Sequence, residues 1–324
     1  MLTNASSFPF TDDNGTVWLA FADWGVRAGR RPIICVHGLT RQGRDFDELA
    51  HRLSSDFKVI EVDVVGRGKS GWLADKQAYN YDTYLRHIDG LLDYRAVDAC
   101  DWIGTSMGGI LGMLLAAQEE TPIRRLILND VGPYIPKAAL ERIGEYVGEN
   151  PSFANLQEAL AYFQKVHADF GDLTEVQWSD LTMHSVQREA DGSYRLHYDP
   201  AIGDPFKGEQ KDVDLWEIYD QIKCPTLVLR GANSGLLTRE TAEEMTRRGP
   251  MAELIEFPNC GHAPSLMEEA QIEAVQNWLL IDHFGEFEEE EAEEPAEEEA
   301  VVIMAAAEEE TQVVVMLAAA AVVA

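Results

Sequence analysis

Short apolar runs alternate along the chain with segments in which apolar residues recur at helical spacing. A strand buried in a parallel sheet is apolar throughout, whereas an amphipathic helix repeats its apolar positions every three or four residues. Strands are predicted over 32–36, 58–62, 101–104, 125–128, 226–229 and 253–257, and helices over 46–53, 81–92, 107–118, 239–248 and 268–284. This alternation predicts an α/β fold with a mostly parallel sheet that is covered by helices on both faces.

The start of the chain departs from this rhythm with a predicted β-hairpin. Apolar residues at 8–10 and 17–21 flank the turn sequence Asp12-Asp13-Asn14-Gly15. Asn-Gly between two apolar runs is a strong short-range hairpin signal, because both residues adopt positive φ readily. We therefore expect an antiparallel pair of strands at this end of the chain.

A longer interruption runs from about 132 to 216. Here the pattern is helical and rich in aromatic residues, with one hairpin turn predicted at Asp191-Gly192. Because the alternation of strands and helices resumes afterwards, an insertion between two halves of one sheet is the simplest account. We predict a core formed by 1–132 and 217–285, and a cap or lid formed by 133–216.

The last segment, 286–324, has a different composition. From Glu286 to Glu310 there are 13 glutamates and no Lys or Arg, and alanine and valine stretches are interspersed and follow. A glutamate block repels itself and stays solvated, so we predict a disordered tail or an appended segment. Its longest uncharged apolar stretch, 313–324, has 12 residues. A membrane span needs about 20, so we expect no membrane partner.

The charge of the chain excludes one class of partner. Its 324 residues include 26 basic and 57 acidic side chains, and the net charge is -31. The chain ahead of the glutamate-rich segment is acidic on its own account. A protein that follows nucleic acid phosphates needs a surplus of Lys and Arg. We therefore expect a small-molecule substrate and no nucleic acid partner, and the sequence leaves the oligomeric state unknown.

The N-terminal residues and the cysteines indicate a reducing compartment. Residues 1–10 contain neither a basic n-region nor an apolar h-region, so no secretory signal is expected. Cys35, Cys100, Cys224 and Cys260 are widely spaced and form no CxxC pair. Reduced, mostly buried thiols are therefore expected, with no metal site and a cytoplasmic location.

The pentapeptide at 104–108 is the most informative motif. Gly104-Thr105-Ser106-Met107-Gly108 has the form G-x-S-x-G and lies between a predicted strand and a predicted helix. In that context the serine stands on a sharp, strained turn, and small residues on either side leave room for it. The hydroxyl of Ser106 then lies at a helix N-terminus, where developing negative charge is favoured. A purely structural Gly-Ser turn is the alternative.

A serine hydroxyl needs a base, which must come from another part of the chain. His262 lies in Asn259-Cys260-Gly261-His262-Ala263-Pro264, between the last predicted strand and the last predicted helix. This position puts it at the same edge of the sheet as Ser106. A loop histidine without a catalytic role is the alternative. Five other histidines lie within predicted helices or the insert, namely His51, His87, His167, His184 and His197.

A second turn contributes a candidate oxyanion hole. The strand at 32–36 runs directly into His37-Gly38-Leu39. The backbone N–H of Leu39 and that of Met107 could together hold a tetrahedral oxyanion, and removing one such donor typically costs about 3 kcal/mol. Without Ser106, the same turn would only end a strand. Candidate substrate-binding residues on and near this turn are His37, Gly38, Arg41 and Arg44.

Together these motifs resemble the α/β-hydrolase family with a lid. His37-Gly38, the segment Asp63-Val64-Val65-Gly66-Arg67-Gly68-Lys69-Ser70, the elbow around Ser106 and Gly261-His262 occur in the family's order across residues 1 to 285. The resemblance implies an eight-stranded sheet, a cap formed by the insert, and hydrolysis through an acyl-enzyme on Ser106 with no cofactor. Relatives with an aspartate nucleophile, such as epoxide hydrolases and haloalkane dehalogenases, are excluded by Ser106.

The sequence departs from the family at the triad acid. Members usually place it after the strand at 226–229, where an Asp is expected at 235 and this chain has Gly235. Asp130, which ends the strand after the elbow helix, stands where some relatives carry the acid instead. It could orient His262, or it could only cap a turn. The third possibility is a variant that lacks its acid and turns over slowly or not at all.

Three functional hypotheses follow. The favoured one is a carboxylesterase-like serine hydrolase with Ser106, His262 and Asp130 as its triad. A carbon–carbon bond hydrolase of the meta-cleavage-product type is the second, because such enzymes also carry a Ser-Met-Gly-Gly elbow, and Arg41 or Arg44 would then bind a carboxylate. The third is a catalytically impaired binding protein. Nucleotide binding at Gly68-Lys69-Ser70 is not expected, since a phosphate-binding loop requires Gly at position 63.

Overall fold

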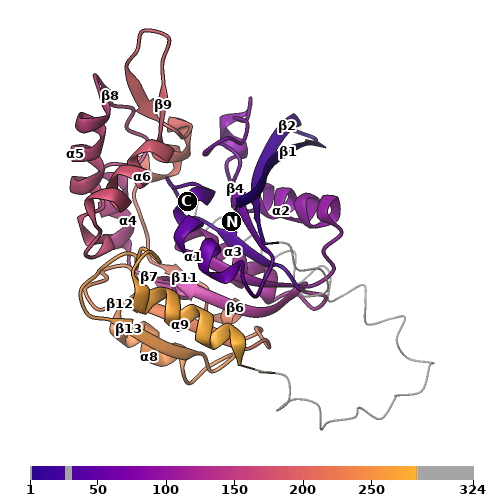
Figure 1. The fold of residues 1–324 in the computed structure, drawn as a ribbon. Coiled ribbons are helices and arrows are strands. Elements are labelled where there is room, and N and C mark those ends of the chain that lie inside the picture. The colour runs from indigo at the N-terminus through magenta and orange to yellow at the C-terminus, as the bar shows by residue number, and fades with distance from the viewer. Residues whose placement is uncertain (1, 26–30, 282, 284–324) are drawn as a thin grey trace, which may run out of the picture.

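A computed structural model of the chain describes residues 2–25, 31–281 and 283 (Figure 1). An eight-stranded sheet runs through its centre, in the order β1-β2-β4-β3-β5-β6-β12-β13. The strands are β1 (Leu2–Asp12), β2 (Gly15–Trp24), β3 (Ile33–Val36), β4 (Val59–Asp63), β5 (Cys100–Thr105), β6 (Ile123–Asn129), β12 (Thr226–Gly231) and β13 (Glu253–Phe257). The prediction for 286–324 lies outside the described residues.

The sheet is parallel except at its N-terminal edge. β1 pairs antiparallel with β2, and β2 pairs antiparallel with β4, while every other neighbouring pair is parallel. The turn between β1 and β2 is the predicted hairpin, and Gly15 there has φ +102°. A positive φ of this kind costs glycine nothing because it has no Cβ.

Helices cover both faces of the sheet. The main ones are α1 (Asp47–Leu53), α2 (Tyr81–Arg95), α3 (Met107–Ala116), α8 (Arg239–Met245) and α9 (Glu269–Leu280). Two apolar clusters fill the space between sheet and helices: one includes α2, α3 and α8, and the other includes α1 and α9. Because side chains alternate along a strand, Trp102 enters the first cluster and Ile103 the second. The predicted fold class is confirmed.

Helix ends differ slightly from the predicted ones. α8 stops at Met245 instead of Arg248, with Thr246 as its C-cap. α9 stops at Leu280, because Ile281 is extended. α1 is preceded by the 3-10 turn η1 (Gly43–Phe46), which the apolar spacing did not separate from the helix.

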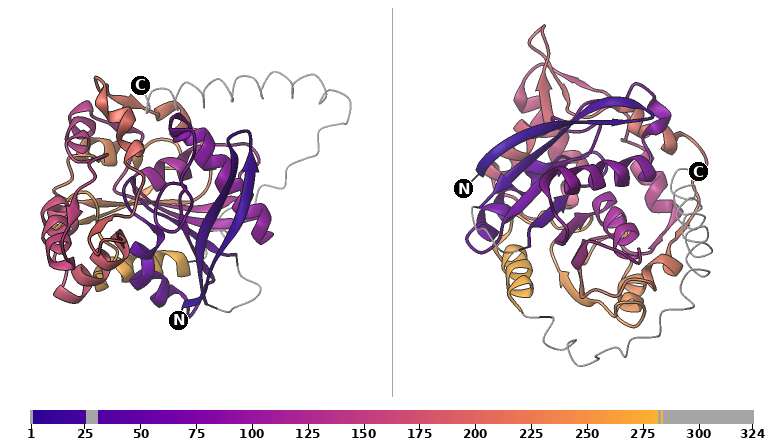
Figure 2. Two further views of the ribbon diagram at one scale, coloured as in Figure 1. Left: turned by 90° about the horizontal axis from the view of Figure 1, so that it is seen from above. Right: turned by 90° about the vertical axis from the view of Figure 1, so that its right-hand side faces the viewer.

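The insert lies between β6 and β12 and forms its own small unit at one end of the sheet (Figures 1 and 2). Its base is a ribbon in which β7 pairs antiparallel with β11, and its outer part is a three-stranded sheet in the order β8-β10-β9. The predicted hairpin turn at Asp191-Gly192 is confirmed between β9 and β10. The elements are β7 (Tyr134–Ile135), α4 (Lys137–Gly144), β8 (Ser152–Phe153), α5 (Leu156–Val166), η3 (Ala168–Phe170), α6 (Glu175–Ser185), β9 (Val186–Arg188), β10 (Tyr194–Leu196), η4 (Pro200–Lys207) and β11 (Val213–Asp214). The division at 132, 216 and 285 stays a prediction.

Two further features concern the chain as a whole. All four cysteines are free thiols, and all but Cys224 are buried. In the part of the chain that the structure describes, no helix has the length and apolar character needed to cross a bilayer.

Candidate active site

Ser106 stands on a strained turn between β5 and α3. Its backbone has φ 52° and ψ -116°, a conformation that side-chain-bearing residues rarely adopt. A Cβ at Gly104 would lie 2.2 Å from the Gly108 carbonyl oxygen, and a Cβ at Gly108 would lie 2.0 Å from the Val36 carbonyl oxygen. Only glycine fits at either position, so the spacing of the motif follows from the packing of this turn.

Three segments distant in the sequence bring Ser106, His262 and Asp130 together. The Nε2 atom of His262 lies 3.0 Å from Ser106 Oγ, and its Nδ1 atom lies 2.7 Å from Asp130 Oδ2. Ser106 follows β5, Asp130 follows β6 and His262 follows β13, so all three lie at the carboxyl edge of the parallel strands. The arrangement provides a hydroxyl, a base that can take its proton, and a carboxylate that fixes the orientation of the base.

Asp130 is completely buried and held on both oxygens. Oδ1 accepts a hydrogen bond of 2.8 Å from the Gly231 amide, and Oδ2 accepts one of 2.5 Å from the Ser234 hydroxyl as well as that from His262. Gly231 and Ser234 belong to the segment in which the family usually places the acid. That segment therefore contributes hydrogen-bond donors to an acid that comes from a neighbouring strand. Gly235 itself is exposed, and a Cβ there would lie 3.7 Å from Arg142 Nη1.

The turn after β3 lies directly beside Ser106. A Cβ at Gly38 would be 3.6 Å from Ser106 Cβ, so the main chain of this turn passes close to the hydroxyl-bearing residue. Among the described residues, no group accepts a hydrogen bond from the amides of Leu39 or Met107. Met107 is also the first residue of α3, where the helix dipole favours negative charge. The two amides are therefore unengaged donors next to Ser106.

The His37 side chain holds this turn in place and is not available to a ligand. It is almost fully buried, its Nδ1–H donates to the Gly38 carbonyl at 2.7 Å, and its Nε2 accepts from the Val64 amide at 3.0 Å. Burial lowers the pKa of His37 from 6.5 to about 3, so the ring is neutral. These bonds fix the tautomer and use both ring nitrogens. Its tentative assignment as a substrate-binding residue gains no support from this geometry.

Arg67 also holds the turn after β3 in place, a role that was not predicted from the sequence. It is fully buried, its Nε–H donates to the Leu39 carbonyl at 2.9 Å, and its Nη1 donates to the Val65 carbonyl at 2.8 Å. The guanidinium also lies 4.8 Å from the centroid of the Tyr84 ring. Because Arg67 holds the carbonyl of Leu39, it fixes the peptide that precedes Thr40 and restrains the turn that carries the Leu39 amide. The only sequence feature that could have indicated this role is the arginine between Gly66 and Gly68.

Asn129 connects the turn that carries Ser106 to the loop that carries His262. This role was also not predicted from the sequence. Its Nδ2 donates to Thr105 Oγ1 at 3.0 Å and to the Pro264 carbonyl at 2.9 Å. The amide of Ser106 in turn donates to the Asn129 carbonyl at 3.0 Å. The residue therefore links the two segments that carry Ser106 and His262, and these contacts join residues far apart in the sequence.

Of the two arginines considered for a carboxylate, Arg41 is the one near Ser106. A Cβ at Gly38 would touch Arg41 Cγ at 3.8 Å, and the guanidinium pairs with both oxygens of Asp45 at 2.7 and 2.8 Å. Its Nη1 lies 3.4 Å from Nε2 of His167, a residue of the insert. Burial, followed by the charges of Arg41 and His262, lowers the pKa of His167 well below its usual value. His167 is therefore a neutral side chain beside Arg41.

Arg44 points elsewhere. Its Nε donates to both oxygens of Asp47 at 2.6 and 2.8 Å. It lines a separate cavity with Glu61 and His184, and none of its hydrogen bonds or ion pairs joins it to Ser106 or His262 in the described chain. Its assignment as a substrate-binding residue therefore finds no contact with the site.

The insert is joined to the loop that carries His262 by two hydrogen bonds. The Gly261 amide donates to the Asp169 carbonyl at 2.7 Å, and Gln177 Nε2 donates to the Met267 carbonyl at 2.9 Å. The first of these bonds restrains the residue next to His262. Across the residues with described positions, no group of three or more His, Cys, Asp or Glu side chains could hold a metal ion.

The chain is similar to proteins of one family. A family model described as alpha/beta hydrolase fold matches residues 31–269. A 3-hydroxybutyrate-oligomer hydrolase of Cupriavidus necator is 43% identical over 263 residues, which cover 78% of this chain and 90% of that protein. The crystal structure of an alpha/beta hydrolase from Novosphingobium aromaticivorans has a TM-score of 0.78 and 35% identity, covering 86% of this chain and 99% of that one. A 2-hydroxy-6-oxo-2,4-heptadienoate hydrolase of Pseudomonas putida is 26% identical, covering 73% of this chain and 84% of that protein.

Proposed function

Because the chain belongs to the α/β-hydrolase fold family, we propose that it is a serine hydrolase that cleaves carboxylic ester bonds. The observation that carries the proposal is the continuous hydrogen-bonded series from Ser106 through His262 to Asp130. The Ser106 end of this series lies on a strained turn beside two unengaged amides. There an ester carbonyl can be attacked and its oxyanion held.

In the first half of the reaction, Ser106 Oγ attacks the ester carbonyl carbon while His262 Nε2 takes its proton. The carbonyl oxygen becomes an oxyanion, and the Leu39 and Met107 amides donate to it. Asp130 stabilises the imidazolium through Nδ1 and remains ionised. Collapse of the tetrahedral intermediate breaks the bond to the alkoxy oxygen, which leaves as an alcohol with the proton from His262. The acyl group then remains on Ser106.

Water completes the second half. His262 removes a proton from a water molecule, which attacks the acyl-enzyme carbonyl and forms a second oxyanion on the same two amides. When this intermediate collapses, Ser106 Oγ leaves and takes its proton back from His262. The products are a carboxylic acid and an alcohol, and the chain returns to its starting state without any oxidant or reductant.

The acyl group is proposed to be short, and a small hydroxyacyl ester is the preferred substrate class. The relative named for hydrolysis of 3-hydroxybutyrate oligomers supports the same class.

Turnover assays test the proposal. The full chain should hydrolyse p-nitrophenyl butyrate and linear oligomers of 3-hydroxybutyrate, and should prefer p-nitrophenyl butyrate to the palmitate ester. Ser106→Ala should lower kcat by a factor on the order of 10⁴ or more. Ser55→Ala, an exposed serine in the turn after α1, is the matched control and should leave kcat unchanged. Equal turnover by the native protein and Ser106→Ala would remove the proposal.

A carbon–carbon bond hydrolase is the second candidate. The Ser106-Met107-Gly108-Gly109 elbow and the relative that acts on 2-hydroxy-6-oxo-2,4-heptadienoate favour it. In this reading Arg41 binds the carboxylate of the dienoate. Turnover of that substrate at a kcat/KM above that for the oligoester would favour this candidate over ester hydrolysis.

A further inference from the structure

A short antiparallel bridge joins the insert to the loop after β4, with Arg67 opposite Tyr198. Beside this pair, the Asp199 amide donates to the Gly66 carbonyl at 2.8 Å. Arg67 is also the residue that holds the Leu39 carbonyl in the turn after β3. The insert therefore contacts the main chain of the same loop that restrains the candidate oxyanion hole.

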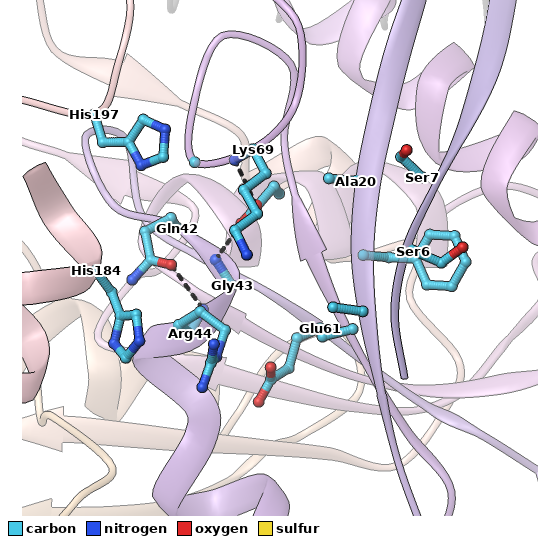
Figure 3. Close-up of a pocket in the computed structure, with 15 residues that line it drawn as sticks. Ser6, Ser7, Ala20, Gln42, Gly43, Arg44, Glu61, Lys69, His184 and His197 are labelled. Carbon is cyan, nitrogen blue, oxygen red and sulfur yellow. Dashed lines mark hydrogen bonds between the residues drawn. The ribbon is translucent and has the colours of Figure 1, made fainter. Parts of the chain in front are cut away.

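Residues of this junction line a cavity of about 250 Å³ between the N-terminal hairpin, the turn after β3 and the insert (Figure 3). The Gly68 amide donates to the His197 carbonyl at 3.0 Å, which is the second bond of the bridge. The Asp63 carboxylate accepts from the Gly43 amide at 2.7 Å and from the Lys69 amide at 2.8 Å. The loop after β4 is thus tied to the insert on one side and to the segment that follows the turn after β3 on the other.

The Asp199 carboxylate adds a second attachment of the insert to the core, and only 3% of this residue is exposed. Oδ2 accepts a hydrogen bond of 2.8 Å from the Tyr79 hydroxyl and forms an ion pair with Lys76 Nζ. Oδ1 accepts from the Ala201 amide at 3.1 Å. Burial, followed by the hydrogen bond to Asp199, raises the pKa of Tyr79, so the hydroxyl keeps its proton and donates it. One carboxylate oxygen therefore holds two core side chains.

Tyr79 connects this carboxylate to Gly66 and Arg67. Gly66 has φ +83°, and a Cβ there would lie 2.6 Å from Tyr79 Cε1, so the ring packs directly on the Gly66 main chain. The Arg67 guanidinium lies 5.9 Å from the centroid of the same ring. Arg67 in turn donates to the Leu39 carbonyl at 2.9 Å. A continuous set of contacts therefore runs from Asp199 of the insert to the turn after β3.

We propose that Asp199 is a positioning residue of the oxyanion hole, which acts through Arg67 on the turn that carries the Leu39 amide. This inference rests on the proposed function, in which that amide donates to the oxyanion. Asp199 holds the loop after β4 with both its amide and its carboxylate, so Arg67 keeps the direction in which it reaches the Leu39 carbonyl. Because the oxyanion forms only when the ester carbonyl is attacked, loss of Asp199 lowers kcat and spares KM.

Steady-state kinetics of the full chain with p-nitrophenyl butyrate test the proposal. Asp199→Ala should lower kcat by about tenfold with little change in KM. In an Arg67→Met background the same substitution should lower kcat by less than about twofold, because residues that act through one another are not additive. A tenfold loss in both backgrounds, or native kcat in Asp199→Ala, would overturn the proposal.

Two further variants complete this test. Asp204→Ala removes another aspartate of the insert, whose ion pair with Lys207 is exposed, and should leave kcat unchanged. Tyr79→Phe removes only the hydroxyl that reaches Asp199 and keeps the ring on Gly66. It should lower kcat in the native background and not in Arg67→Met, and it decides the question if a thermal melt shows Asp199→Ala to be unfolded. An equal loss in both backgrounds would again contradict the proposal.

Amide hydrogen exchange tests the same link without a substrate. The Arg41 amide donates to the Gly38 carbonyl at 3.1 Å within the turn after β3, so its exchange rate reports how firmly the turn is held. Exchange at Arg41 should be about tenfold faster in Asp199→Ala and in Arg67→Met than in the native protein, and unchanged in Asp204→Ala. An unchanged rate in Asp199→Ala would refute this inference even if the native protein hydrolyses esters. Faster exchange without any ester turnover by the native protein would support the link and count against the proposed function alone.

Discussion

The hydroxyl of Ser234 lies 2.5 Å from Oδ2 of Asp130, the same oxygen that faces His262. Ser234 Oγ also accepts from the Leu236 and Leu237 amides at 3.2 and 3.1 Å. The hydroxyl proton is therefore directed to Asp130. The segment around Ser234 contains no carboxylate of its own, and its hydroxyl holds the Asp130 carboxylate in place.

Ser234→Ala should lower kcat for p-nitrophenyl butyrate by about tenfold, with little change in KM. A hydrogen bond to a charged group contributes about 1.5–3 kcal/mol, and its loss leaves Asp130 less well oriented toward His262. Ser234→Thr should restore most of the activity. Ser193→Ala, a partly exposed serine in the turn between β9 and β10, serves as the control. Native kcat in Ser234→Ala would show that this hydroxyl has no positioning role.

Asp130→Asn should lower kcat by about 10⁴ while the protein stays folded, because the amide cannot stabilise an imidazolium and favours the wrong tautomer. Steady-state kinetics with the same ester and a thermal melt provide the measurement. Should this variant keep full activity, Asp130 would be only a structural residue at the end of β6.

Gly235→Asp should leave kcat close to the native value. The His262 Nδ1 bond is already made by Asp130, and a side chain at the exposed position 235 would meet Arg142. An acid-deficient variant would behave in the opposite way, with a rate increase of orders of magnitude. The double variant Asp130→Asn/Gly235→Asp shows whether a carboxylate at 235 reaches His262 once Asp130 is removed.

Arg67→Met should lower kcat by about tenfold or more, because a charge-assisted bond to the Leu39 carbonyl contributes about 1.5–3 kcal/mol. The loss should fall on kcat and spare KM, since the Leu39 amide is needed for the oxyanion and much less for substrate binding. Arg67→Lys retains the charge without the planar set of donors, so it should be impaired as well. A variant whose only defect is a lower melting temperature would assign Arg67 to stability alone.

Glu61→Gln should become more stable relative to the native chain as the pH rises. Below a pH near 4.5 the carboxyl is neutral in both the folded and the unfolded states. Above it the unfolded chain ionises first, because burial raises the pKa in the folded state, and the native protein loses stability until the folded pKa is passed. Denaturant unfolding at pH 4 and pH 8 should show a difference in free energy of unfolding between the two proteins that grows with pH. A difference that does not vary with pH would contradict the raised pKa.

Much of the fold could be predicted because it depends on local patterns. Alternating apolar runs and helical spacings specify which segments are strands and helices, and their order led to the α/β class. The need for glycine at positions 104 and 108 could also be predicted from the motif, since a Cβ at either would collide with nearby main chain. Prediction was weaker at helix ends such as Met245 and Leu280, where the stop depends on one or two residues.

The sequence by itself determined the fold class, the turn that carries Ser106 and the placement of His262 at the same sheet edge. Only the tertiary structure decided which carboxylate faces His262, and it brought Asp130, Ser234 and Arg67 to their partners. Asp130 and His262 are separated by 132 residues, and Arg67 and the Leu39 carbonyl by 28. Such contacts produce no periodic pattern in the sequence, because their geometry arises from how strands and loops assemble in three dimensions.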